Sequence, residues 1–189
     1  MPRRVQPGPG LGSPVSKIRA VIITGPGFQD EEVVYPYYRL LEEGYAVDVA
    51  AKDGQQVFGK YGVPARVTMA TSKLSAADFD LVILPGGFEA PDRVRLDRDV
   101  LRFIQEMDAA QKLIGAICHG PWILVSARVL RGRRVTGYMS IEEDLRNAGA
   151  EYVEAPVVED GNLITAPHYR DNGVFMRAIV ARFQSTVRT

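Results

Sequence analysis

Three short apolar runs, each closed by glycine or proline, constrain this chain more than any other feature of its sequence. They are 18–24 before Gly25, Pro26 and Gly27, 81–84 before Pro85, Gly86 and Gly87, and 113–117 before Cys118, His119, Gly120 and Pro121. Continuous apolar runs are typical of strands buried in a parallel sheet, and a stripe at helical spacing follows each run. The pattern predicts an α/β fold, a mainly parallel central sheet with helices on both faces, whose sites form beyond the carboxyl ends of the strands.

Two other segments carry weaker signals. Residues 54–67 combine polar turns with short extended pieces and predict a small antiparallel flap. Extended segments at 152–158 and 163–165 flank the turn Asp160-Gly161.

Length and composition favour one domain. The chain has 189 residues, of which 46% are hydrophobic and 24% charged, as in ordinary globular proteins. The start carries arginines followed by Pro, Gly and Ser in place of the apolar stretch of a secretory signal. We therefore expect a flexible tail over residues 1–16 and a single domain over residues 17–189.

The charge balance excludes some partners. Lysine plus arginine equals aspartate plus glutamate at 23 each, so a nucleic-acid footprint is missing and a small-molecule or peptide substrate fits better. No apolar run approaches the roughly 18 to 20 residues that span a bilayer, and one cysteine makes no internal disulfide, so we expect a cytoplasmic protein. One cysteine and two histidines are too few for a closed metal site, and no dinucleotide or phosphate-loop motif appears, so we expect no metal and no cofactor.

Cys118, the only cysteine, is predicted to be a nucleophile at a strand-to-helix turn. A lone cysteine is usually a small buried hydrophobe, but this one stands between an apolar run and Gly120-Pro121, and Pro121 suits the first position of a helix. The positive end of that helix should lower the pKa of the thiol. His119 points away from Cys118 if the backbone is extended and converges with it at a tight elbow, and the sequence leaves this geometry open.

Gly86 and Gly87 follow a buried strand, where glycines let backbone amides face a reacting centre. With the amide of His119 they are our candidates for an oxyanion hole. An ordinary strand-to-helix turn explains the two glycines about equally well.

The segment AICHGP at 116–121 resembles the nucleophile elbow of the ThiJ/PfpI family, within the class I glutamine amidotransferase-like superfamily. The likeness covers about residues 18–183 and includes EEVVYPYYRLLEEG, LPGGFEAPDRVR, and the NAG and EDGN segments. It is similar above all to PfpI-type intracellular proteases and bacterial general stress proteins. The resemblance implies a flavodoxin-like three-layer sandwich, Cys118 as nucleophile, and Glu32 as the acid whose carboxyl contacts the sulfur.

Simple electrostatics supports that role for Glu32. A carboxylate repels a thiolate, so Glu32 should have a raised pKa and donate a hydrogen bond. Asp30 and Glu31 are better explained as a helix cap and a solvated first-turn acid.

The resemblance also implies a third acid, contributed by a neighbouring subunit to orient the histidine. The matching position is Asp92, so activity would require a dimer or hexamer. The sequence departs from the family twice here, with aspartate in place of glutamate and one residue inserted in the loop at 88–90.

The sequence offers two further candidates for the site. His168 resembles the distant histidine of a glutamine amidotransferase, but Asp171 lies three residues on instead of two, which makes His168 a loop residue with at most a supporting role. Trp122 is a candidate substrate contact, although aromatic residues on such helices more often belong to the core or to an interface.

The sequence therefore predicts a stress-protective cysteine hydrolase. As suggested for related proteins, its substrates would be glycated protein and methylglyoxal adducts, or peptides. The alternative is a redox sensor whose cysteine is oxidised without robust turnover, because an acidic thiol is both nucleophilic and oxidisable.

Overall fold

The computed structural model describes residues 18–184, so the tail expected over residues 1–16 lies outside the described residues. A seven-stranded sheet runs through its centre in the order β3-β2-β1-β4-β5-β9-β8. All neighbouring pairs are parallel except β8 and β9. In that order the strands are Met69–Ala70, Ala46–Ala51, Arg19–Ile23, Leu81–Leu84, Leu113–Ile117, Leu163–Ala166 and Val158–Asp160.

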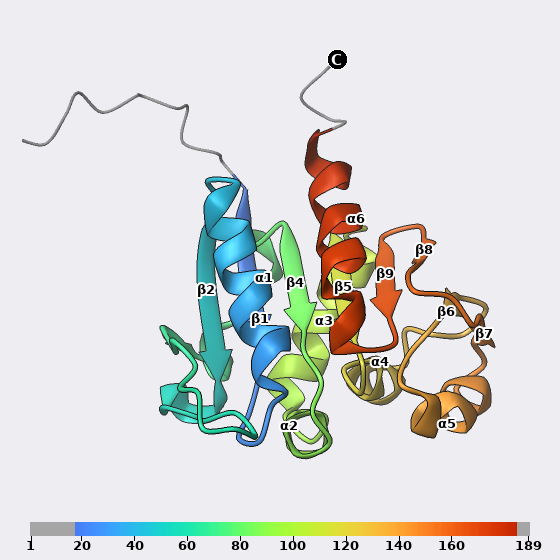
Figure 1. Cartoon of the computed structure of the whole chain (residues 1–189), viewed down its shortest axis with the longest axis horizontal. Coiled ribbons are helices and arrows are strands. Elements are labelled where there is room, and N and C mark those ends of the chain that lie inside the picture. The colour runs from blue at the N-terminus through green and yellow to red at the C-terminus, as the bar shows by residue number, and fades with distance from the viewer. Residues whose placement is uncertain (1–17, 185–189) are drawn as a thin grey trace, which may run out of the picture.

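Helices cover both faces of this sheet (Figure 1). Helices α1 (Asp30–Glu42) and α6 (Asn172–Gln184) pack on one face, and α3 (Arg98–Ala109) and α4 (Pro121–Ala127) pack on the other. Two apolar cores result, one on each side of strands that are themselves fully buried. The three-layer α/β sandwich expected from the sequence is confirmed.

Two local expectations are corrected. The turn at 160–161 does join an antiparallel pair, but the strand before it is only Val158–Asp160. Residues Glu151–Tyr152 form β7, which pairs with β6 (Arg134–Val135) in a separate parallel sheet. The extended segment expected at 152–158 is interrupted because Ala155 and Pro156 form a bend. Proline also lacks the amide hydrogen that a strand ladder needs.

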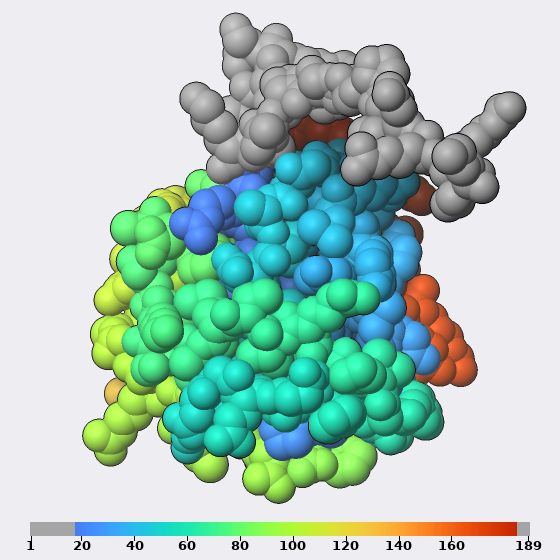
Figure 2. Space-filling model, turned by 90° about the vertical axis from the view of Figure 1, so that its left-hand side faces the viewer, coloured from blue at the N-terminus to red at the C-terminus, as the bar shows by residue number. Residues whose placement is uncertain are grey.

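The antiparallel flap expected in the segment between β2 and β3 is present only as a short pairing without assigned strands. Phe58 and Pro64 form an antiparallel bridge, flanked by hydrogen bonds from Gly59 N to Val63 O and from Ala65 N to Val57 O, and Gly59 also bridges to Phe28. The cyan-green segment that follows β2 covers much of the face seen in Figure 2. It therefore wraps the carboxyl end of the sheet as a loop instead of extending it.

The strand order brings three loops together. Strands β1, β4 and β5 are adjacent and parallel, so the turns after them leave from one edge of the sheet. The chain runs from β1 to β2 on one side and from β4 to β5 on the other, which makes the gap between β1 and β4 the switch point where sites form in such sheets. Helix α1, the short α2 (Glu89–Val94) and α4 all start at this edge.

Candidate active site

Cys118 occupies a strained turn between β5 and α4. Its backbone φ is +60°, in the left-handed region that residues with a side chain rarely adopt. Two hydrogen bonds hold it there: its amide donates to Ala166 O at 2.9 Å, and its carbonyl accepts from the amide of Tyr138 at 2.8 Å. The sequence expectation of a sharp elbow agrees with this geometry.

The elbow brings the side chains of Cys118 and His119 together, which the sequence left open. Sγ lies 3.2 Å from Nδ1 of His119, and Nε2 lies 3.2 Å from Oγ of Ser140. The imidazole stacks on Tyr138, with centroids 4.8 Å apart. Partial burial lowers its pKa, which favours the neutral ring that can accept a proton.

Glu32 lies beneath the sulfur, in the first turn of α1. Its side chain is fully buried, and Oε2 accepts a hydrogen bond from the amide of Gly86 at 2.6 Å. Oε1 has no hydrogen-bond partner among the described residues, although the carboxyl is within hydrogen-bonding reach of Cys118. Burial raises the pKa of Glu32 to about 8, so the carboxyl carries a proton at neutral pH.

The structure corrects the expectation that the helix lowers the pKa of Cys118. Burial, followed by the charge of Glu32, raises this pKa above its ordinary value, and the amides of Gly87 and His119 only partly offset the rise. The thiol and the carboxyl therefore form one coupled acid. When Glu32 holds the shared proton, its O–H can donate to a thiolate and the repulsion disappears.

The two glycines after β4 have different tasks. The amide of Gly86 donates to Glu32, so the structure contradicts its predicted place in an oxyanion hole. The amides of Gly87 and His119 face the sulfur and stay as candidates. A Cβ at position 86 would lie 2.6 Å from the Cβ of Cys118 and 2.7 Å from Oε2 of Glu32, so only glycine lets the acid approach the nucleophile.

Asp92 and Trp122 lie further from the sulfur. Asp92 is exposed on α2, and within residues 18–184 no hydrogen bond or ion pair joins it to His119, whose Nε2 lies beside Ser140. Trp122 packs edge-on against His119 at 5.3 Å and donates from Nε1 to Asp144 at 3.0 Å. Trp122 is thus placed to support the imidazole, and the role of Asp92 stays a prediction.

His168 also lies near Tyr138, the ring on which His119 stacks. Its ring is 5.9 Å from that of Tyr138, and its Nδ1 accepts from the amide of Arg170. Sequence reasoning missed Tyr138 and Ser140. The only sequence signal for these two residues is that they closely follow the segment that forms β6 (Arg134–Val135). In the structure the chain after β6 passes the elbow, where the amide of Tyr138 donates to Cys118 O.

Over residues 18–184 no three His, Cys, Asp or Glu side chains are arranged to hold a metal ion. Within the same range, no helix has the length and apolar character needed to cross a membrane.

Comparison with known proteins identifies the family. The model of the DJ-1/PfpI family matches residues 18–182. The chain belongs to that family. It is 40% identical over 163 residues to "Deglycase PH1704" of Pyrococcus horikoshii, covering 86% of this chain and 98% of the relative. It is 39% identical over 166 residues to "Putative cysteine protease YraA" of Bacillus subtilis, covering 86% and 96%.

Solved structures of this family share the fold. A two-domain protein from Anabaena variabilis, with DJ-1/ThiJ/PfpI-like and ferritin-like domains, superposes with a TM-score of 0.86 at 35% identity. The match covers 88% of this chain and 48% of that one. The DJ-1/PfpI domain thus accounts for the whole of the sheet and its covering helices.

Proposed function

We propose that this protein is a cysteine hydrolase that removes early glycation adducts, such as those of methylglyoxal, from thiols and amines. One observation carries the proposal: Sγ of Cys118 lies at a positive-φ elbow, 3.2 Å from the imidazole of His119 and against the buried acid Glu32. The relatives named deglycases support this substrate class. The relative named as a putative cysteine protease makes peptides the second candidate.

The residues of the site can carry out this reaction with one water and no external oxidant or reductant. His119 takes the proton of the Cys118 thiol, the resulting thiolate attacks the hydroxyl-bearing carbon of the adduct, the bond from that carbon to the protein thiol or amine breaks, and His119 gives the proton to the leaving atom. Water then adds to the same carbon and the carbon–sulfur bond breaks. The products of this second step are the dicarbonyl hydrate and the free thiol of Cys118, which again lies beside protonated Glu32.

The amides of Gly87 and His119 favour these steps because they face the sulfur, where negative charge rests before the attack. They stabilise the negative charge that forms on the buried sulfur when His119 takes its proton, and so partly offset the raised pKa of the thiol. Their donors are fixed by the backbone, so no reorganisation is needed at the moment of reaction.

We also propose that the site is completed in a homo-oligomer. Asp92 lies between Phe88 and Leu96, whose side chains are 63% and 78% exposed. Such apolar residues around an acid suit an interface with a second copy, whose Asp92 would replace Ser140 at Nε2 of His119. Sedimentation velocity on wild type and Leu96→Asp tests it. A monomeric wild type with full activity would overturn it.

Cys118→Ser tests the proposed activity, because it changes one atom at the nucleophile. We expect at least roughly a thousand-fold loss in the release of free thiol from the methylglyoxal adduct of N-acetylcysteine. Such adducts form reversibly, so free methylglyoxal is measured as well. A rate that follows free methylglyoxal instead of the adduct would contradict deglycation, and a peptidyl reporter tests the peptidase version.

The same preparation separates the enzyme from a sensor. Intact mass after mild peroxide shows whether the one cysteine gains two oxygens. A stoichiometric gain without measurable turnover would favour the redox alternative.

A further inference from the structure

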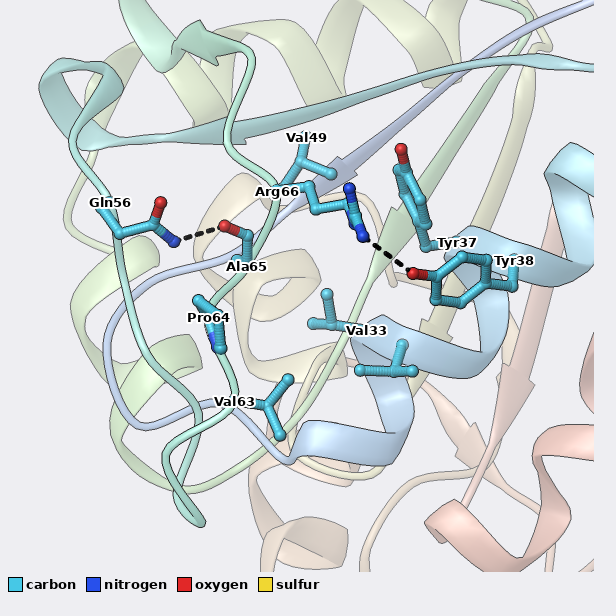
Figure 3. Close-up of a pocket in the computed structure, with 10 residues that line it drawn as sticks. Val33, Tyr37, Tyr38, Val49, Gln56, Val63, Pro64, Ala65 and Arg66 are labelled. Carbon is cyan, nitrogen blue, oxygen red and sulfur yellow. Dashed lines mark hydrogen bonds between the residues drawn. The ribbon is translucent and has the colours of Figure 1, made fainter. Parts of the chain in front are cut away.

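A cavity of about 460 Å³ lies beside the candidate active site. We call it the acidic pocket. It is lined by Thr136, Gly137, Tyr138, Met139, Glu142, Tyr152, Glu154, Ala155, Pro156, Pro167, His168 and Asp171. It differs from the apolar pocket between α1 and the 56–66 loop, where Figure 3 shows the guanidinium of Arg66 beside Tyr37 and Tyr38.

Tyr138 forms the wall between the acidic pocket and the nucleophile. Its ring stacks on His119 at 4.8 Å and faces His168 at 5.9 Å, and His168 lines the pocket. Its amide donates to the carbonyl of Cys118. A group bound in the pocket would thus lie one aromatic ring away from the reacting pair.

The charges of the pocket have one sign. Three carboxylates line it, and no lysine or arginine does so within the part of the chain that the structure describes. Glu142 is paired with Arg146 at 2.8 Å, whereas Glu154 and Asp171 have no ion pair among residues 18–184. Two carboxylates are therefore left to attract a cation.

The other lining groups suit a planar cation. Tyr138, Tyr152 and His168 contribute rings to the pocket wall, and the guanidinium of Arg146 already lies 5.5 Å from the centroid of Tyr152, so this wall accepts a planar cation in the structure itself. Thr136 is fully buried, yet its Oγ1 has no hydrogen-bond partner in the described residues. A buried hydroxyl oxygen without a partner is costly, and an N–H donor from a ligand would satisfy it.

We propose that the acidic pocket binds an unmodified arginine side chain that neighbours the reacting residue of a polypeptide substrate. The enzyme would then prefer adducts in basic segments over those in neutral or acidic ones. This inference rests on the proposed function, because it says where the part of the substrate that does not react is bound.

Matched peptides test the charge preference. The substrates are methylglyoxal adducts of acetyl-Cys-Gly-Arg-amide and acetyl-Cys-Gly-citrulline-amide, since citrulline keeps the shape of arginine and lacks its charge. We expect kcat/KM to be at least about tenfold higher for the arginine peptide, as for other desolvated charge pairs. The ratio should shrink at high ionic strength.

The double variant Glu154→Gln with Asp171→Asn should bring this ratio to about one. Both peptides are measured on the same preparation of a variant, so a loss of folded protein lowers both rates equally and leaves the ratio of the two kcat/KM values unchanged. Glu143→Gln is the matched control, because Glu143 is exposed on α5 (Glu142–Asn147) and does not line the pocket. Equal wild-type rates for the two peptides, or an unchanged ratio in the double variant, would overturn the inference.

The adduct of N-acetylcysteine separates this inference from the proposed function. If wild type does not turn it over, the proposed function fails, and binding of the two unmodified peptides is measured by NMR titration instead. Tighter binding of the arginine peptide, lost in the double variant, would still support a cation subsite. Equal binding would refute it.

Discussion

The first turn of α1 carries two buried carboxylates with opposite tasks. Asp30 accepts hydrogen bonds from the amides of Tyr61 at 2.9 Å and Val63 at 3.0 Å, one on each oxygen. Glu32 accepts from one amide, and its Oε1 has no hydrogen-bond partner within residues 18–184. The side chains are 5% and 0% exposed, so burial alone does not distinguish them.

The number of donors distinguishes them. Two loop amides donate to the side chain of Asp30, so Asp30 fixes the loop that covers the end of the sheet. A buried carboxyl with one donor and a sulfur beside it is better off protonated, and the pKa of Glu32 is raised accordingly. The same helix turn therefore holds one acid for structure and one for chemistry.

Among changes to the acids of this helix turn, Glu32→Gln should give the largest effect on activity. The glutamine side chain can still accept a hydrogen bond from the amide of Gly86 and donate one to the sulfur. It cannot release or take up a proton as the charge on Cys118 changes. We expect a fall in kcat of roughly a hundred-fold or more, with Asp30→Asn as the matched change two residues away. Similar losses of kcat in Glu32→Gln and Asp30→Asn would contradict the assignment of Glu32 to catalysis and of Asp30 to the fold.

The same variant should remove a pH dependence of stability. The pKa of Glu32 rises on folding from an ordinary 4.5 to about 8, so between these values the folded state holds a proton that the unfolded state has lost. Its stabilisation is complete below pH 4.5 and is lost as pH rises through 8. Urea unfolding from pH 5 to 8.5 should show a decline of a few kcal/mol in the free energy of unfolding of wild type and a flatter profile in Glu32→Gln.

The sequence predicted the elements that local pattern determines. The strands at 81–84 and 113–117 begin and end where their apolar runs do, and the elbow at Cys118 follows from a run that meets Gly120-Pro121. Its family resemblance also placed Glu32 under the sulfur. Parallel topology then brings the loops together without further information.

Partners that are distant in sequence were beyond such reasoning. Asp30 was interpreted as a cap, but it bonds amides 31 and 33 residues away. Gly86 was assigned to the oxyanion hole because the sequence does not show that its amide is already used by Glu32. The expected low pKa of Cys118 failed because burial depends on every element packed around it.

Asp30→Asn should destabilise the fold while sparing the chemistry. One amide of the loop would face the NH₂ group of asparagine in place of an oxygen, and the charge on the remaining bond would be lost. We expect a decrease of about 1–3 kcal/mol in the free energy of unfolding. Hydrogen exchange should accelerate at the amides of Tyr61 and Val63, and unchanged exchange there would contradict the structural role.

Glu31→Gln should give the smallest effect, because Glu31 is exposed between these two acids and, among residues 18–184, its carboxylate has one hydrogen bond, accepted from the side chain of Gln29. We expect the free energy of unfolding to stay within about 0.5 kcal/mol of wild type. All three acids lie at the amino end of α1, where the helix field acts on each. That field favours the charged form and cannot explain the raised pKa of Glu32. If Glu31→Gln flattened the pH profile as Glu32→Gln should, then repulsion from Glu31 would govern the pKa of Glu32, and burial would not.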